Sequence, residues 1–271
     1  MRQVLCIVFL VSLILVAHAQ NTFNKVIDFD GGTETGFTII ESNGEFLIVG
    51  GGSAKVFNWW TGIKLVKLDQ IGNVIDTASY GKENESWFPG TKGSCVKISE
   101  NKFAFGGSVR PNNSNSDGLL FIFDSELDSV LFRRYGNWNT EVFFMLRPTR
   151  DGGYALLGEA RRSFLDDRAF YLLKTDSLGN IEWEEYYDGP KVDRGTTLEL
   201  TTDGGFVASG VSGSFSPGDS HGLLYKLDSI GGVEWRKTYG TQGEDYAGSV
   251  GLASDGGYYF WGGLDTTVKV G

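Results

Sequence analysis

The chain has 271 residues, with 24 basic against 34 acidic side chains and a formal net charge of −10. Such an excess of acid repels the phosphate backbone of nucleic acids, so nucleic acid is excluded as a partner. Glycine is frequent at 39 residues, proline is scarce at 5 and aromatic residues make up 14% of the chain, a composition typical of many short strands joined by tight turns.

The first 19 residues predict a secretory signal peptide. Arg2 is followed by an apolar run from Val4 to Val16, which ends at Ala17-His18-Ala19. A helix of this length is too short to span a membrane, and the small residues after it fit a cleavage site. We therefore expect a mature chain that begins near Gln20, has no transmembrane segment and is secreted or held at the cell surface.

Few residues remain for metal, redox or imidazole chemistry. Removal of the signal peptide leaves Cys95 as the only cysteine and His221 as the only histidine. An internal disulfide and a multi-histidine metal site are therefore excluded. We predict no cofactor and no metal site, and we assign no catalytic residue.

Three short motifs recur in the same order along the rest of the chain. The first is Asp-Gly-Gly followed by an aromatic residue, which begins at Asp151, Asp203 and Asp255, each 52 residues from the next. The second is apolar-Lys-x-Asp, which ends at Asp69, Asp176 and Asp228. The third is an aromatic residue followed by glycine, as in Tyr80-Gly81, Tyr135-Gly136 and Tyr239-Gly240. The chain is therefore built from a repeated unit of roughly 50 residues.

Each repeat predicts four short antiparallel strands. Alternating polar and apolar residues, as in Thr197–Thr201, and short apolar runs, as in Phe46–Val49, have the period of strands, and Asp-Gly and Asn-Gly pairs supply tight turns. Four strands in such a unit are typical of a β-propeller blade. We predict an all-β propeller with four-stranded antiparallel blades over 36–81, 93–136, 146–189 and 197–240, and a partial blade over 246–271.

The sequence leaves two alternatives for the propeller ring. Lys25–Glu34 mirrors Trp235–Glu244, so residues 23–32 could supply the outer strand of the last blade and close a ring of five. Alternatively, the chain is the front part of a longer protein with more blades. The absence of a Lys-x-Asp motif after Asp255 favours the second alternative.

The repeated tryptophans and aspartates have structural interpretations. Trp183 and Trp235 occupy the same place in successive repeats, which predicts packing between sheets rather than a sugar-binding surface. The repeated aspartates stand singly at turns, without the alternating spacing of a calcium loop. We therefore predict that they form turns.

The strings "DGGYALLGEARRSF", "FYLLKTDSLGNIEWEEYYDG" and "DGGFVASGVSGSF" carry a resemblance. They look like the propeller-type repeats of large secreted or surface bacterial proteins, which are often exported by type IX secretion. The resemblance implies a propeller fold and export from the cell, and it implies no particular activity. A more distant similarity to quinoprotein-type blades transfers no cofactor residue.

The expected function is that of an exported, non-enzymatic module that binds an unknown protein or glycan or serves as a scaffold. Loops between the second and third strands vary in length and sequence while the strands stay alike, which favours binding at these loops. Trp59, Trp60 and Arg110 lie in or beside them and are the possible ligand contacts.

The alternative is a carbohydrate-active or other hydrolase that uses carboxylates in the propeller channel. The candidates are Asp166, Asp167, Glu182, Glu184 and Glu185, although adjacent acids on exposed strands are typical of a solvated face. Asp219-Ser220-His221 does not form a triad, because consecutive residues of an extended chain cannot aim their side chains at one another. A hydrolase of this kind needs two carboxyl groups that converge in one cleft.

Overall fold

The computed structural model describes residues 34–54, 60–91, 94–112, 114–136, 139–161, 168–187, 189–215 and 219–264. Several predicted features lie outside these residues: the signal peptide over 1–19, the ring-closing strand over 23–32, Trp59, Asp166 and Asp167. In the described part of the chain, no helix has the length and apolar character needed to cross a membrane.

The prediction of an all-β chain built from four-stranded antiparallel sheets is confirmed. The first sheet contains β1 (Glu34–Ser42), β2 (Glu45–Ala54), β3 (Trp60–Leu68) and β4 (Val74–Tyr80). The third contains β10 (Glu141–Pro148), β11 (Tyr154–Ala160), β12 (Ala169–Thr175) and β13 (Ile181–Tyr187). The fourth contains β14 (Asp193–Leu200), β15 (Phe206–Ser212), β16 (His221–Leu227) and β17 (Val233–Tyr239). In all three, each strand pairs with the next one in the sequence.

The second and fifth sheets depart from this plan. The second has five strands: β5 (Glu85–Pro89), β6 (Val96–Ser99), β7 (Lys102–Pro111), β8 (Asp117–Asp124) and β9 (Ser129–Tyr135). Here β5 and β6 both pair with β7, so two short strands take the place of one. The fifth sheet consists of β18 (Tyr246–Leu252) and β19 (Tyr258–Gly263).

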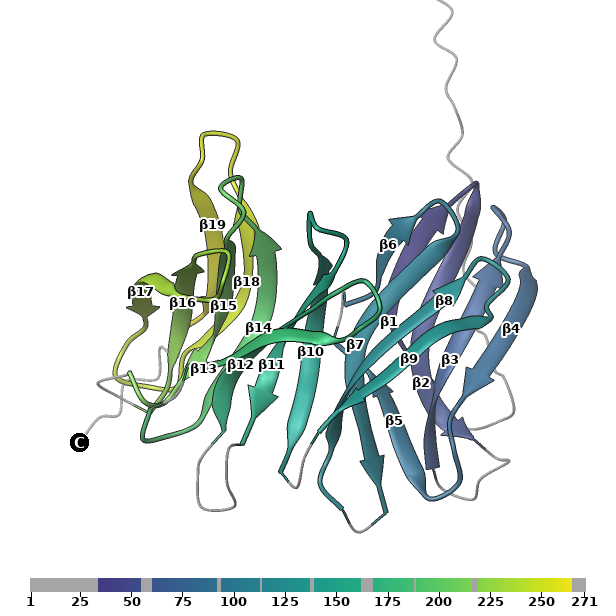
Figure 1. Cartoon of the computed structure of the whole chain (residues 1–271), viewed down its shortest axis with the longest axis horizontal. Coiled ribbons are helices and arrows are strands. Elements are labelled where there is room, and N and C mark those ends of the chain that lie inside the picture. Colours follow the sequence, from purple (N-terminus) through teal and green to yellow (C-terminus); the bar gives the residue numbers. More distant parts are fainter. Residues whose placement is uncertain are drawn as a thin grey trace, which may run out of the picture.

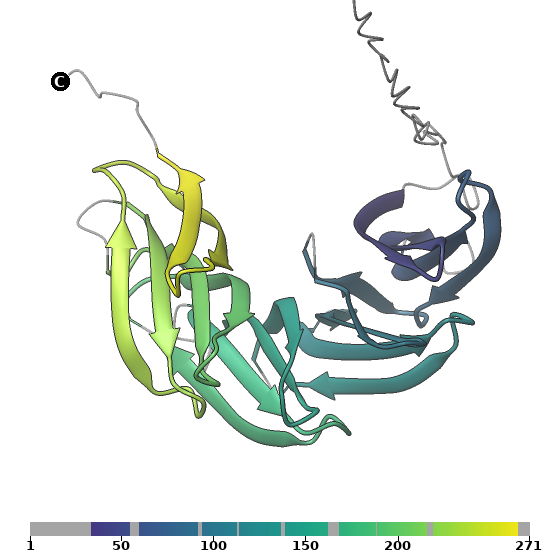
Figure 2. The same ribbon diagram turned by 90° about the horizontal axis from the view of Figure 1, so that it is seen from above.

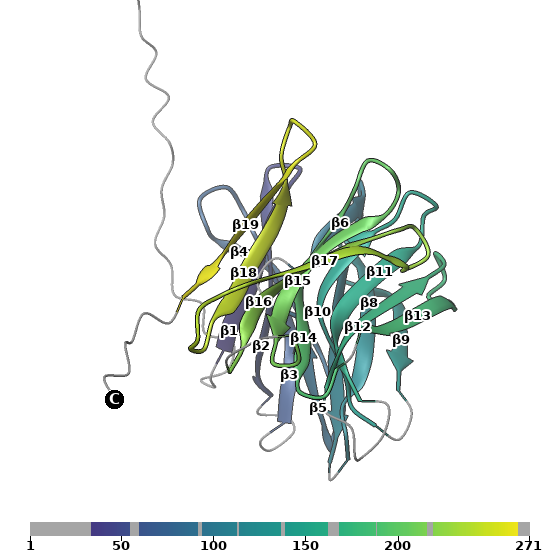
Figure 3. The same ribbon diagram turned by 90° about the vertical axis from the view of Figure 1, so that its left-hand side faces the viewer.

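The sheets follow one another around an open arc (Figures 1 and 2). The first strands β10, β14 and β18 of successive sheets contact one another, so neighbouring sheets pack with their first strands side by side. Figure 3 looks toward the last sheet, β18–β19, at one end of the arc. The first sheet, coloured purple in Figure 2, lies at the other end.

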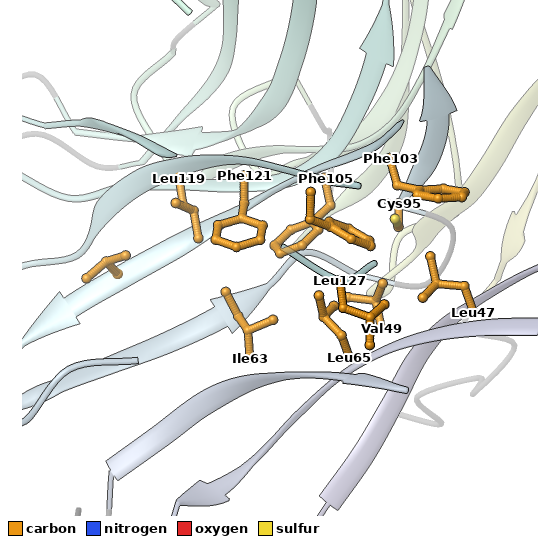
Figure 4. Packing of buried hydrophobic residues seen from close by; sticks show 12 residues of the cluster. Leu47, Val49, Ile63, Leu65, Cys95, Phe103, Phe105, Leu119, Phe121 and Leu127 are labelled. Carbon is orange, nitrogen blue, oxygen red and sulfur yellow. The ribbon is translucent and has the colours of Figure 1, made fainter. Parts of the chain in front are cut away.

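An apolar cluster fills each junction between neighbouring sheets. Phe105 and Phe121 of the second sheet lie against Ile63 and Leu65 of the first (Figure 4). Phe123 belongs to the same cluster, and all five side chains are at most 1% exposed. Corresponding clusters join the second sheet to the third, the third to the fourth and the fourth to the fifth. Burial of one such side chain contributes roughly 1.5–3 kcal/mol, so these clusters hold the arc together.

The predicted packing role of the two tryptophans is confirmed. Trp183 meets the ring of Phe206 edge-on at 6.1 Å, and Trp235 meets Tyr258 at 5.9 Å. Phe206 and Tyr258 each follow an Asp-Gly-Gly motif of the next sheet. The repeated tryptophan therefore packs one sheet on the next.

The repeated aspartates form turns, as predicted. The Asp176 carboxylate accepts hydrogen bonds from the backbone N–H groups of Leu178 and Asn180, at 2.9 and 2.8 Å. Gly179 between them has a φ of 77°, a conformation that glycine adopts without a steric penalty. The corresponding turn of the second sheet places Leu127 at a φ of 66°.

At three junctions, a tyrosine at the end of the fourth strand bonds the turn of the next sheet. The hydroxyl of Tyr135 donates to the Gly179 carbonyl at 2.8 Å, and that of Tyr187 donates to the Gly231 carbonyl at 2.7 Å. Burial raises the pKa of both tyrosines, so that the hydroxyls remain protonated donors. These bonds join consecutive sheets at their outer edge.

The lysine of the Lys-x-Asp motif contacts the aspartate of the Asp-Gly-Gly motif in the folded chain. Lys226, which is 3% exposed, contacts Asp203 at 2.9 Å and Glu234 at 3.2 Å. Lys174 makes the same contacts in the third sheet, with Asp151 at 2.8 Å and Glu182 at 2.6 Å. These triads neutralise a lysine that the strand pattern would otherwise bury unpaired.

The ion triads predict a loss of stability in acid. Hydrogen bonds from Lys174 and then Thr149 hold the pKa of Asp151 far below its usual range, and Thr201 and then Lys226 do the same for Asp203. A carboxyl whose pKa is lower in the folded state stabilises the fold above its unfolded pKa of about 3.9 and loses this effect as the pH falls. The free energy of unfolding, measured by urea titration, should therefore decrease as the pH falls from about 5 to 3.

The double variant D151N/D203N should show a shallower decrease than the wild type. Asp255 offers a matched control, because it binds the Gly257 N–H in the same motif but contacts no lysine among the described residues. D255N should therefore leave the pH dependence unchanged. Equal slopes in the wild type and the double variant would contradict the role of the triads.

Removal of a tyrosine hydroxyl should lower the free energy of unfolding only where that hydroxyl bonds the next sheet. Tyr187→Phe should lower the free energy of unfolding by about 1–2 kcal/mol, because the Gly231 carbonyl loses its donor inside a packed junction. Tyr239 occupies the same place in the fourth sheet, but it is 43% exposed and its hydroxyl has no partner among the described residues. Tyr239→Phe is therefore the control and should change the free energy little; a similar loss in both variants would disprove the assignment.

Candidate functional site

Of the predicted ligand-contact residues, only Arg110 has a side chain in the described structure. Trp59 lies outside the described residues, and so does the side chain of Trp60, whose backbone begins β3. Arg110 is exposed near the end of β7, with no hydrogen bond or ion pair to another described residue. A joint site formed by these three residues therefore stays a prediction.

The predicted carboxylate candidates in the described part belong to the outer strand β13. Glu182 is paired with Lys174, and Glu184 accepts a hydrogen bond from the Tyr171 hydroxyl at 2.6 Å. Glu185 is exposed. These acids serve the packing and solvation of one sheet, as the solvated-face interpretation predicts.

Asp219, Ser220 and His221 do not form a triad, as expected. The Ser220 hydroxyl donates to the Asp245 carbonyl at 3.1 Å. The His221 ring hydrogen-bonds through Nε2 with the Thr241 carbonyl at 2.5 Å. His221 Nε2 also lies 3.9 Å from Oδ2 of Asp245. Serine and histidine thus contact other groups and not each other.

A charged cluster that the repeat does not explain lies where β11, β12 and β14 meet. Glu159 of β11 is 3% exposed, and each of its carboxylate oxygens accepts from one guanidinium. Nη1 of Arg168, just before β12, lies 2.5 Å from Oε1, and Nε of Arg194 in β14 lies 2.6 Å from Oε2. The cluster assembles because β11 pairs with β12 and β14 packs against β11.

The other sheets show that the fold does not need this cluster. Glu159 stands opposite Val142 in the register of β10 and β11. The same place is taken by Val211 in the fourth sheet and by Gly51 in the first. The second sheet has Ser108 there. Because none of these other sheets has a charged side chain at this place, the Glu159 cluster is a candidate for function.

Asp193 adds a second buried carboxylate beside Arg194. Its side chain is fully buried, and Oδ1 accepts from the Ser214 N–H at 3.3 Å. Among the described residues, Oδ2 has no hydrogen-bond partner, and neither does the buried Nε of Arg161. A buried acid also stands 52 residues before Asp193, at Glu141, and 52 residues after it, at Asp245, so this carboxylate belongs to the repeat.

A pocket of about 440 Å³ opens over the start of β14, beside this cluster. Its volume falls within the usual range for small-molecule sites. The pocket is lined by Lys191, Val192, Arg194, Val211, Asp219 and Ser220. Cationic, anionic and hydroxyl side chains thus surround one cavity, an arrangement that suits a polar ligand with several hydrogen-bonding groups.

Glu244 lies on a backbone segment that is bridged to the pocket-lining Ser220. Ser220, which lines the pocket, forms an isolated parallel bridge with Glu244. Asp219 and Glu244 are both exposed and come from these two bridged segments. Two exposed acidic residues therefore belong to adjacent backbone segments, and one of them, Asp219, lines the pocket.

No protein-family model and no curated protein sequence matches the chain. The solved structures similar to it include a β-1,2-mannobiose phosphorylase from Listeria innocua, with a TM-score of 0.49, 10% identity and coverage of 88% of this chain and 89% of that one. A mannose phosphorylase from Leishmania mexicana has a TM-score of 0.44 and 14% identity, covering 87% of this chain and 81% of that one. A glycoside hydrolase has a TM-score of 0.41 and 9% identity, covering 82% and 61%.

These comparisons contradict the prediction of a non-enzymatic binding or scaffold module, which is corrected here. The similar structures just named are all enzymes, and their names place their substrates among carbohydrates. The prediction rested on the absence of a recognisable catalytic motif, and a site assembled from distant strands leaves no such motif. At these TM-scores the likeness does not transfer a substrate or a mechanism to this chain.

The Glu159 cluster predicts a measurable contribution to stability. Glu159→Gln leaves two guanidiniums beside a neutral amide and should lower the free energy of unfolding by about 1–3 kcal/mol. The control is Glu185→Gln, because Glu185 is an exposed acid with no ion pair among the described residues. Urea titration of both variants checks this, and equal stabilities would show that the buried pairs contribute nothing.

Proposed function

We propose that the chain is a carbohydrate-active enzyme that cleaves a glycosidic linkage in the pocket over the start of β14. The observation that carries the proposal is the pocket itself, which combines a ligand-sized volume with charged and hydroxyl groups from separate segments. A sugar presents many hydroxyl groups, and each needs a donor or an acceptor when it is taken from water. The walls of this pocket offer both kinds of group.

Cleavage of a glycosidic bond requires an acid and a base or nucleophile. Two carboxyl groups usually supply these two functions. Asp219 lines the pocket, and Glu244 follows on the segment bridged to Ser220. We assign the two catalytic roles to this pair. Glu159 is unsuited to proton transfer, because it is buried and both of its oxygens are held by arginines.

The same proposal includes the finer architecture. The five sheets are consecutive blades of a β-propeller, supported by their strand order and by an apolar cluster at every junction. The signal peptide over 1–19 and a location outside the cell remain part of this proposal. Such a location would give the enzyme access to extracellular glycans.

The test is an assay of sugar release from a panel of oligosaccharides, with and without inorganic phosphate. Turnover that requires phosphate would identify phosphorolysis, and turnover without it would identify hydrolysis. Asp219→Asn and Glu244→Gln should each reduce turnover by about 100-fold or more, since an acid–base group contributes roughly 10²–10⁴ to the rate.

Glu185→Gln serves as the matched control, because it removes an exposed carboxylate on the outer strand β13, away from the assigned pair. It should turn over like the wild type. Thermal melting checks that every variant is folded. A wild type inactive on all the oligosaccharides, or full activity in both Asp219→Asn and Glu244→Gln, would refute the proposal.

A further inference from the structure

Arg194 presents one end of its guanidinium to the pocket. Its Nε is engaged by the buried Glu159 carboxylate at 2.6 Å, and its Cζ lies 5.8 Å from the centre of the Phe144 ring. Nη1 and Nη2 have no partner among the described residues, while the side chain is 43% exposed and lines the cavity. The Glu159 carboxylate thus holds the Nε side of the guanidinium, and the N–H donors of Nη1 and Nη2 remain available to a ligand.

Lys191 supplies a second cation on the same wall. Its backbone is fixed at both polar groups by the Ser214 hydroxyl, which accepts from the Lys191 N–H and donates to the Lys191 carbonyl, each at 2.9 Å. The exposed lysine side chain lines the pocket beside Arg194. Two cations therefore line one wall of the pocket in a chain whose net charge is −10.

The opposing groups narrow the choice of ligand. Asp219 and Ser220 line the same cavity and offer a carboxylate acceptor and a hydroxyl. A small inorganic anion would use the cations and be repelled by Asp219. A sugar that carries a carboxylate would place its anion on the cations and donate its hydroxyl groups to Asp219.

We propose that the saccharide bound in this pocket is acidic, a uronic acid residue, and that Arg194 and Lys191 bind its carboxylate. The inference rests on the proposed function and adds a substrate class to it. The two terminal nitrogens of a guanidinium match the two oxygens of a carboxylate and form paired charge-assisted hydrogen bonds. Lys191 adds a point charge beside this pair.

Calorimetric titration tests the inference with four probes: glucuronate, galacturonate, their neutral parent sugars and inorganic phosphate. At least one uronate should bind about tenfold or more tightly than its neutral parent, and its affinity should fall as NaCl is raised, since salt screens exposed charges. Arg194→Met should abolish the preference, and Arg194→Lys should reduce it. Thermal melting verifies that the variants are folded.

Arg150→Met is the control, because its guanidinium bonds the carbonyls of Thr201 and Thr202 and does not line the pocket. It should keep the uronate preference. Equal affinity for uronates and neutral sugars, binding of phosphate as tight as that of the uronates, or no binding of any probe would overturn the inference. If neutral oligosaccharides are cleaved without a uronate preference, the substrate class is wrong while the proposed activity stands.

Discussion

Packing between the faces of neighbouring sheets is the interaction on which the rest of the structure depends. A four-stranded sheet of this size has two apolar faces and cannot bury both by itself. Here each junction is filled by one cluster of aromatic and aliphatic side chains, with tryptophans or phenylalanines at the contact. The repeat also has three polar features: the aspartate turns, the tyrosine bonds and the lysine triads. They lie around these clusters and fix the orientation of one sheet on the next.

The repeat also provides an internal reference for function. A feature found in several sheets, such as the lysine triads of the third and fourth sheets, is explained by the needs of folding. A costly feature found once requires another explanation. Glu159 with its two arginines is such a feature, because the first, second and fourth sheets have a glycine, a serine and a valine at the same place in the register. The charged pocket over β14 lies next to Glu159. The residue that departs from the repeat and the cavity are therefore found at the same place in the molecule.

The Glu159 cluster links the two proposals physically. A guanidinium free in solution loses conformational freedom when it binds a ligand, whereas one already held by a buried carboxylate loses less. Glu159 therefore serves the pocket indirectly, by holding Arg194 in place. In the proposed site the buried Glu159 carboxylate therefore has a positioning role although it contacts no ligand.

Much of the fold could be predicted from the sequence, because the elements that form it are local. The four-stranded unit, the turns at Asp69, Asp176 and Asp228 and the packing of Trp183 and Trp235 all follow from spacings within one repeat or between adjacent ones. The split of the first strand into β5 and β6 was not predicted, since the second repeat is the least regular in sequence.

The candidate site was decided by the tertiary structure alone. Glu159 and Arg194 are 35 residues apart and belong to different repeats, and no motif in the sequence connects them. The carboxylates that sequence reasoning selected, Glu182, Glu184 and Glu185, are conspicuous because they are close together, yet they lie on an outer strand. Sequence by itself determined the repeated unit, since turns and strand periods are local properties of the chain. Only the stacking of β14 against β11 determined which charges meet, because that contact depends on the whole arrangement of sheets.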